Sequence, residues 1–589
     1  MDGILKNSDL FGFSKLTLIK VVLLFILTVI ELLSYNKLFA QGSNIPFEGE
    51  IIRKVDVKIL NPGSDTAFLK TMESKVRSNF YLYPSERFSR LVVNAYLGKL
   101  RRIPEVANAD YEIFLSESGG LDLTILIELK ENAVLKYRNY GFLSSGRIRD
   151  IPVLIQTPNS ILEVSVKTGQ MFYSNINPWY SRPDTFLFGN PLADGNIKGS
   201  GFSGWYEGYL SAGLYTMFRV IKPVYLFGGG SFISSWKLGA DLFTAPNNTY
   251  TALEDAFAGL FSGFKTKEGN ILKFLIRAGR FQISIADGML IRNTSSNGSY
   301  KSALQLNPRW ATDLTYQISV GYNRSRVQLL EINPDEFYQT DTHTKIRLAN
   351  AEIGENSRNQ IGLTYAAVPV SDFKYYTQTD IYYRAGLKVA DFRYYHMPLP
   401  GTGGFIFKTE IARQFHSDFQ MNAWGGYGEI GWSFMKEKYS PYVTFRHSVF
   451  TGDNLQTPEF ERWDPLLSGG NGEEWVQGAN DYKVVQNSNI IAERLQLKLR
   501  PIPVMEVVSQ FWLFRAYDSN NLGGTAALST LSGKNYGMEI NAALKYYPNK
   551  NWYFHGQIAF TKPGDAVIDT LDKSLPSWLS IMGFFTYTL

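Results

Sequence analysis

Short runs of alternating apolar and polar residues continue from about residue 132 to the last residue of the chain. In one run the apolar or aromatic residues are Tyr316, Ile318, Val320 and Tyr322, and the residues between them are Gln317, Ser319, Gly321 and Asn323. The same pattern recurs at 360–365, 537–546 and 552–561. Successive side chains of a β-strand point to opposite faces of its sheet, so this period of two predicts a long all-β region.

The composition favours the same class of structure. Aromatic residues make up 15% of the chain, and it holds 51 Gly, a residue that destabilises helix interiors. The sequence has no Cys, which excludes a disulfide framework, a thiolate metal site, a Cys nucleophile and a lipidated N-terminal Cys. The net charge of +5 is not gathered into a basic block, so nucleic acid is not an expected partner.

Residues 1–40 are typical of a signal peptide. Lys15 and Lys20 precede the apolar run 21–30, and Ala40 precedes the expected cleavage site. The alternative is a retained membrane anchor, but the run is about half of the ~20 residues that a spanning helix needs, and Glu31 interrupts it. We find no later stretch of ~18 uninterrupted apolar residues, so we expect any membrane crossing to use strands.

Residues 41–131 carry a mixed pattern that predicts a small α+β domain. We expect a strand at 51–60, helices at 65–78 and from Ser85 to about 103, and strands at 110–115 and 121–130. One face of the second helix is apolar and comprises Phe88, Leu91, Val92, Ala95, Tyr96, Leu100 and Ile103. The order β-α-α-β-β resembles a polypeptide-transport-associated (POTRA) domain, the periplasmic module of many outer-membrane translocation barrels. The alternative is an unrelated small α+β domain.

Residues 132–200 are the least regular part of the chain and fit a linker, a plug or the first strands. We assign residues 201–589 to a transmembrane β-barrel. At ~10 residues for each spanning strand, about 16–18 antiparallel strands fit, and a barrel of that size can hold an aqueous lumen.

A soluble β-sandwich also alternates, so the signal peptide and the last strand decide between the two. Residues 578–589 place Ile581, Phe585, Tyr587 and Leu589 on one face. They resemble the terminal recognition strand of outer-membrane barrels, although a terminal Phe is usual there. This predicts a place in the outer membrane among its lipids, with the N-terminal domain in the periplasm, and insertion by the barrel assembly machinery.

Four stretches of the barrel region carry a more specific resemblance. They are 276–282 leading to Asp287-Gly288; 451–454 followed by Phe460, Trp463, Pro465 and Leu466; 514–516; and 537–541 followed by 562–565. In this order they resemble the alginate-export family of outer-membrane barrels over residues 271–589. The resemblance implies export of a uronate-rich polysaccharide. A POTRA-like segment belongs instead with protein-assembly and two-partner-secretion barrels, whose Arg-Gly-Tyr loop we do not find in this sequence.

Cationic residues are predicted to line the lumen once the apolar faces are turned toward lipid. The candidates are Lys273, Arg277, Arg280, Arg384, Lys388, Arg494, Lys498, Arg500 and Lys545, against Glu410, Glu429 and Glu539. Cationic pore linings favour anions. The alternative is that these side chains pair with one another and fill the barrel. Arg494, Lys498 and Arg500, on one strand face without an acid among them, fit that alternative least well.

Nothing in the sequence predicts catalysis. The five His residues lie far apart and make no metal-ligand spacing, and no Ser-His-acid arrangement stands out. We therefore expect no enzyme activity and no cofactor. Three functions remain: a conduit for an anionic polysaccharide or anionic solutes, a barrel whose POTRA-like domain receives a polypeptide or another periplasmic partner by strand addition, and a structural or adhesive barrel. The lumen charge and the barrel motifs favour the conduit.

Overall fold

The computed structural model describes most of residues 47–589, and residues 42–589 form one compact unit. The predicted signal peptide lies outside the described residues. So do the internal positions 48, 63–65, 81, 83, 85, 117–119, 131–152, 157–158, 188–189, 193–198, 355–358, 399–402, 436, 470–474 and 572–573. Among the helices of the described part, none is both long and apolar enough to cross a membrane.

The N-terminal domain has the predicted order β-α-α-β-β. Its elements are β1 (Ile52–Ile59), α2 (Thr66–Arg77), α3 (Arg90–Leu100), β2 (Val106–Leu115) and β3 (Leu121–Leu129). The three strands form a sheet in the order β1-β3-β2, with β1 parallel and β2 antiparallel to β3. Met72 and Val76 of α2 and Leu97 of α3 are buried in one core with the apolar residues of β3.

Helix α3 begins later than the sequence predicts. Ser85, the expected N-cap, lies outside the described residues, and the helix starts at Arg90 with Ser89 in the N-cap position. The backbone before it is bound to β1 and the residues preceding β1. The Ile52 N–H donates to the Glu86 carbonyl over 2.7 Å, and the Phe88 N–H donates to the Glu50 carbonyl over 2.7 Å. Because these groups are used in strand-like pairing, the helix cannot start at Ser85.

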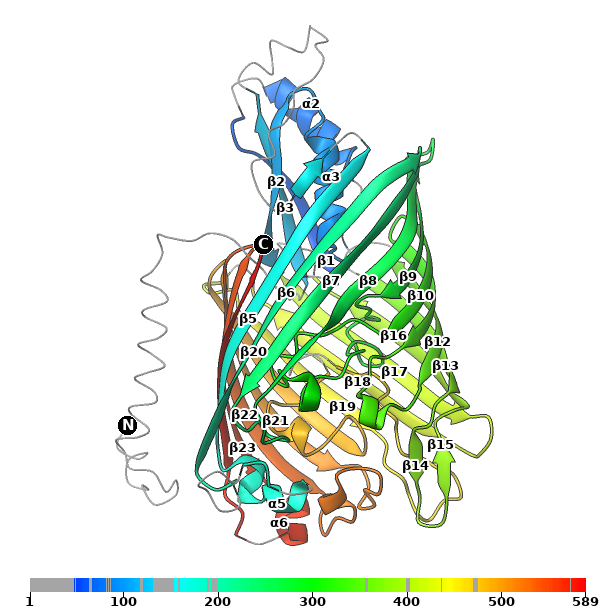
Figure 1. Ribbon diagram of the computed structural model, residues 1–589, viewed down its shortest axis with the longest axis vertical. Coiled ribbons are helices and arrows are strands. Elements are labelled where there is room, and N and C mark those ends of the chain that lie inside the picture. The colour runs from blue at the N-terminus through cyan, green and yellow to red at the C-terminus, as the bar shows by residue number, and fades with distance from the viewer. Residues whose placement is uncertain are drawn as a thin grey trace, which may run out of the picture. The chain divides into compact units, whose positions relative to one another are not determined.

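Eighteen of the described strands close into an antiparallel barrel (Figure 1). They are β5 (Ser160–Ile176), β6 (Phe202–Ile221), β7 (Val224–Leu238), β8 (Asn248–Lys265), β9 (Ile271–Arg280), β10 (Leu314–Tyr322), β11 (Ser325–Asn333), β12 (Lys345–Gly354), β13 (Asn359–Val370), β16 (Leu387–His396), β17 (Gly404–His416), β18 (Ala423–Ser433), β19 (Tyr442–Phe450), β20 (Ile490–Ile502), β21 (Met505–Ala516), β22 (Asn535–Asn549), β23 (Trp552–Pro563) and β24 (Trp578–Thr588). The last strand, β24, pairs with the first, β5, and closes the ring.

Smaller elements complete the chain. Strand β4 (Val153–Gln156) pairs with the start of β5, and β14 (Lys374–Tyr376) and β15 (Ile381–Tyr383) form a hairpin in the loop after β13. Short helices lie in two other loops, α5 (Pro183–Phe186) and α6 (Asp565–Leu571).

The outer face of the barrel is apolar and exposed. Ile318 is 49% exposed, Leu363 51% and Ile540 53%, whereas the alternating Gln317 is 6% exposed and Glu539 is fully buried. A closed sheet with an exposed apolar exterior is built to cross a membrane, since every strand finds its hydrogen-bond partners within the ring. The predicted two-faced alternation therefore holds for these strands, with the polar face turned inward.

The two ends of the barrel differ. At the short-turn end strands are joined by tight turns such as 222–223, 323–324 and 503–504, and at the long-loop end by loops such as 281–313 and 451–489. Of the three interpretations of residues 132–200, the described part supports the first strands, because the barrel strand β5 begins at Ser160. At the short-turn end β5 continues past β24, since its residues 160–166 pair with β6 but not with β24.

We predict that the mature chain fractionates with the outer membrane and migrates faster on a denaturing gel when unheated than when boiled, because the closed ring resists detergent. A chain that ends before Trp578 lacks β24, leaves β5 and β23 unpaired on one side, and should lose the fast form. Recovery in the soluble periplasm, or equal mobility with and without boiling, would contradict the fold.

Candidate functional site

Loops from the long-loop end fill the interior of the barrel. Ile285 and Met289 of loop 281–313, and Trp463 and Trp475 of loop 451–489, are buried in one hydrophobic cluster with inward-facing strand residues. The two loops also pair with each other through a bridge between Ile291 and Leu467. The described residues of these loops therefore occupy part of the barrel interior and pack against its wall.

Loop 281–313 reaches through the barrel to the N-terminal domain. The Arg87 guanidinium donates to the Ala286 carbonyl over 2.8 Å, and Arg292 forms an ion pair with Glu50 at 3.0 Å. Lys408, which faces inward from β17, binds Asp287 of the same loop at 3.1 Å. These contacts connect the N-terminal domain, the loop and the barrel wall.

The same loop carries a carboxylate whose ionisation depends on this assembly. Burial alone would raise the pKa of Asp287. Lys408 and, next in strength, Arg53 of the N-terminal domain outweigh that effect, so the pKa of Asp287 lies below its ordinary value. The charge of Asp287 is thus balanced by cations from both the wall and the domain.

The N-terminal domain also binds the barrel wall directly. Glu86 forms an ion pair with Lys273 of β9 at 2.5 Å. From α3, Arg90 pairs with Glu163 of β5 at 3.1 Å, and Asn94 donates to the same carboxylate over 2.8 Å. The domain is therefore docked at the short-turn end by charged contacts to two separate parts of the wall.

Three of the predicted lumen cations lie on β9. Lys273 faces inward and pairs with Glu86, as described above. Arg277 faces inward, donates to Gln317 over 2.8 Å and stacks on Phe281 at 3.5 Å. Arg280, at the end of the strand, pairs with Asp313 at 2.6 Å and Asp335 at 2.8 Å. Each of these three cations therefore binds at least one side chain of the protein, and two of them, Lys273 and Arg280, bind carboxylates.

Two of the predicted cations are not on the inward face of a strand. Arg384 lies in the loop after the β14–β15 hairpin and pairs with Asp464 at 2.6 Å. Lys388 lies on the outward face of β16, because its neighbours Leu387 and Val389 are buried inside the barrel. Both placements correct the prediction. At this end of β16 the inward residues pack against the loops and are apolar, so the rule that apolar residues face lipid fails.

The four remaining predicted cations face inward, and three of them have acidic neighbours. Arg494 pairs with Glu429 at 2.9 Å, and Arg500 and Lys545 approach Glu506 at 3.4 and 3.8 Å. The carboxylates come from β18 and β21, so a search for acids along β20 alone did not reveal them. Lys498 lies 5.6 Å from the Tyr442 ring.

The sequence analysis missed two cations that join this group. Lys408, Glu429, Arg446 and Arg494 are successive cross-strand neighbours on β17–β20. The Arg446 guanidinium lies 4.6 Å from the Trp475 ring and 5.4 Å from the Trp512 ring. We call Lys408, Arg446, Arg494 and Lys498 the cationic patch. Within it Arg446 and Arg494 are directly opposite each other, an arrangement that destabilises a sheet unless other groups compensate it.

Solved structures resemble this chain only at low sequence identity. No protein-family model matches it, and no curated protein does. Similar solved structures include OccK5 (OpdH) of Pseudomonas aeruginosa, with 10% identity, a TM-score of 0.42, and coverage of 73% of this chain and 98% of that one. A BenF-like porin from Pseudomonas fluorescens Pf-5 has 9% identity, a TM-score of 0.44 and the same coverages. At such identities neither a ligand nor a function can be carried over.

No group of three or more His, Cys, Asp or Glu residues in the described ranges is placed to hold a metal ion.

We predict that Glu429→Gln strongly destabilises the barrel, because it leaves three neighbouring cations without this carboxylate. Breaking a buried pair costs about 3–5 kcal/mol. The matched control is Glu331→Gln, whose partner Arg347 is 65% exposed on the outer face, and such a pair is worth about 0–1 kcal/mol. The temperature at which the fast-migrating gel form disappears would report both. Equal shifts for the two variants would show that Glu429 does not balance the patch.

Proposed function

We propose that this protein is a gated outer-membrane conduit for anionic solutes or an anionic polysaccharide. The observation that carries the proposal is the cationic patch inside a closed barrel, in which Arg494 pairs with Glu429 and Lys408 pairs with Asp287. Cationic linings favour anions over cations. Two of the four, Arg494 and Lys498, come from the cluster that the sequence singled out.

Passage through the barrel requires movement of the parts that fill it. Loop 281–313 and the N-terminal domain meet inside, and ion pairs are among the contacts that hold them. The side chains of Lys273 and Glu86 are 16% and 24% exposed, and those of Arg292 and Glu50 18% and 23%. Ion pairs that solvent can reach are weaker than buried ones, so these contacts can be exchanged for water. The domain and the loop together form the proposed gate.

The orientation of the barrel supports a periplasmic position for the gate. Outer-membrane barrels have short turns on the periplasmic side and long loops outside. The N-terminal domain lies at the short-turn end, where a periplasmic partner could bind it. The C-terminal strand β24 ends at the same side, which fits recognition by the barrel assembly machinery.

The class of cargo within the proposal follows from the resemblance of residues 271–589 to alginate-export barrels, which favours a uronate-rich polysaccharide. Smaller anionic solutes need less movement of the loops. A second candidate function is the handling of a polypeptide, and it is favoured by the POTRA-like order β1-β3-β2, in which β2 is an edge strand. A polypeptide found bound along β2 would support polypeptide handling over the conduit.

We expect the purified protein in planar bilayers to prefer chloride over sodium when it conducts. Replacing Arg494, Lys498 and Arg500 together by Gln removes three inward charges and should reduce the preference. The control replaces Lys388, Arg413 and Arg515, which lie on the outer face, and should leave selectivity unchanged while altering net charge equally. Sodium selectivity in the parent, or equal effects of the two triple variants, would refute an anion pathway.

We expect conductance to rise when the gate is loosened. Glu50→Gln with Glu86→Gln removes the partners of Arg292 and Lys273, so the domain should leave the barrel mouth more often and openings should become several-fold more frequent. The control is Glu112→Gln with Glu128→Gln, two exposed acids of the same domain. A double variant that stays as closed as the parent would contradict the gate, and a barrel closed in every variant would contradict the conduit.

A further inference from the structure

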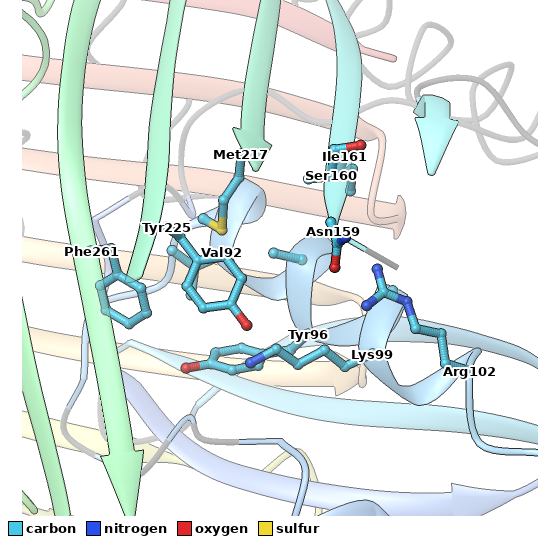
Figure 2. A pocket seen from close by; sticks show the side chains of 12 residues that line it. Val92, Tyr96, Lys99, Arg102, Asn159, Ser160, Ile161, Met217, Tyr225 and Phe261 are labelled. Carbon is cyan, nitrogen blue, oxygen red and sulfur yellow. The ribbon is translucent and has the colours of Figure 1, made fainter. Parts of the chain in front are cut away.

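The outer face of the barrel carries a charged surface that the proposed conduit does not use. The pocket between α3 and the ends of β5–β8 (Figure 2) has a volume of about 40 Å³, which holds a few waters at roughly 10–15 Å³ each and not a larger ligand. The consecutive wall strands β12, β13, β16 and β17, by contrast, place cations on the face that meets lipid.

Four cations lie on the outer face of these strands near the long-loop end. The acids of the same strands all face inward: Glu352, Asp391 and Glu410 are 6%, 5% and 1% exposed. The outer face of this part of the wall is therefore positively charged. We call the four residues the outer cationic row, and they are Lys345 and Arg347 of β12, Lys388 of β16 and Arg413 of β17.

The register of the strands places these cations near one another. Arg347 is opposite Ala367 of β13, and Ala367 is opposite Lys388, so one small residue separates the two cations across the sheet. Two strand spacings put their backbones about 9–10 Å apart. Lys388 is opposite Phe415, and Arg413 is two residues from Phe415, which makes it a diagonal neighbour at about 7–8 Å. The long side chains can thus converge on one head group over Ala367.

The protein itself engages these cations only at the surface. Within the ranges that the structure describes, Lys345 and Lys388 make no hydrogen bond, ion pair or ring contact. Arg347 pairs with Glu331 of β11 at 2.6 Å, but the two side chains are 65% and 34% exposed, and solvent weakens such a pair. A phosphate can therefore contact the row without displacing a buried partner.

The row lies at the border of the apolar outer face. Trp424 of β18 is opposite Arg413 and 44% exposed, and Trp rings are enriched at the level of lipid head groups. Further toward the short-turn end the outward residues are apolar, as are Phe392 at 44% and Ile411 at 50% exposure. At such a border the stems of Lys and Arg lie along apolar surface while their charged ends reach the head groups.

We propose that the outer cationic row binds the phosphate groups of an anionic lipid in the leaflet at the long-loop end. Basic clusters beside a membrane attract anionic head groups, and Lys and Arg donate readily to phosphate oxygens. The acyl chains would lie along Phe392 and Ile411. The row spans three strand spacings, about 14 Å, so a head group with two phosphates contacts more of it than a head group with one. This site lies on the opposite face of the sheet from the conduit and does not depend on what the barrel conducts.

The test is native mass spectrometry of the full mature chain in a non-ionic detergent, with lipids that differ in their head groups. Diphosphoryl lipid A carries two phosphates, monophosphoryl lipid A carries one, and the phosphate of phosphatidylcholine is neutralised by its choline. We expect affinity to fall in this order, by about ten-fold or more from first to last. Equal affinity for all three would overturn the proposal. So would displacement of lipid A by an equal concentration of inorganic phosphate, which has no acyl chain.

Variants assign the binding to the outer cationic row. Lys345→Gln with Lys388→Gln removes no polar contact within the described ranges, so the barrel should keep its fast-migrating gel form. Each cation beside an anionic membrane surface contributes about five-fold to affinity, so diphosphoryl lipid A should bind about ten-fold or more less tightly. If the double variant loses the fast form, Arg347→Gln tests the row with a single substitution.

The matched control is Arg515→Gln with Lys562→Gln. It removes two outward cations at the same end of the barrel, from β21 and β23, and should bind diphosphoryl lipid A as the parent does. Unchanged binding in the folded variants of the row, or an equal loss in the control, would overturn the proposal.

Discussion

The pairing of β24 with β5 is the contact on which the rest of the structure depends. It runs without a register shift from Leu579 opposite Ile176 to Thr588 opposite Lys167. In hydrocarbon an unpaired backbone N–H or carbonyl has no water to bind, so a sheet with open edges cannot cross a membrane. Closure removes the edges and also defines an inside and an outside. The closed ring therefore explains the alternation of each strand, with apolar residues on the outside and polar residues on the inside.

Part of the interior is a packed protein core, built from loops and inward-facing strand residues. Charged side chains form a cross-strand row on β17–β20, in which Lys408 lies opposite Glu429, and Arg494 reaches the same carboxylate across β19. Aromatic rings from the loops also lie against these cations, as the Trp475 ring does 4.6 Å from the Arg446 guanidinium. Asp287 of loop 281–313 supplies part of the negative charge that balances these cations, through its ion pair with Lys408.

The sequence predicted the class and the inward or outward direction of strands in mid-barrel, because lipid imposes one rule on these strands. It predicted the order of elements in the N-terminal domain from the helical and strand periods of its apolar residues. The prediction failed for Lys388, because loops pack against the inner face of the barrel at this point and the residues that face inward there are apolar. The sequence also predicted one apolar face for α3, whereas Val93 packs in the core of the N-terminal domain and Leu91 packs against the barrel wall. The partner of Arg494 could not be foreseen, since Glu429 is 65 residues away in sequence and the register between strands is set by the folded ring.

The position of α3 against the first strand has a consequence for the order in which the chain can acquire its structure. The contact of Asn94 with Glu163 spans 69 residues, whereas that of Trp578 with Asn175, at the closing seam, spans 403. Loop-closure entropy grows with the logarithm of this separation, and the longer loop costs about 1.6 kcal/mol more. The contact of the N-terminal domain with β5 thus costs less loop-closure entropy than the pairing of β24 with β5. The domain can therefore bind β5 before the barrel closes, and the barrel can then close with the domain already bound.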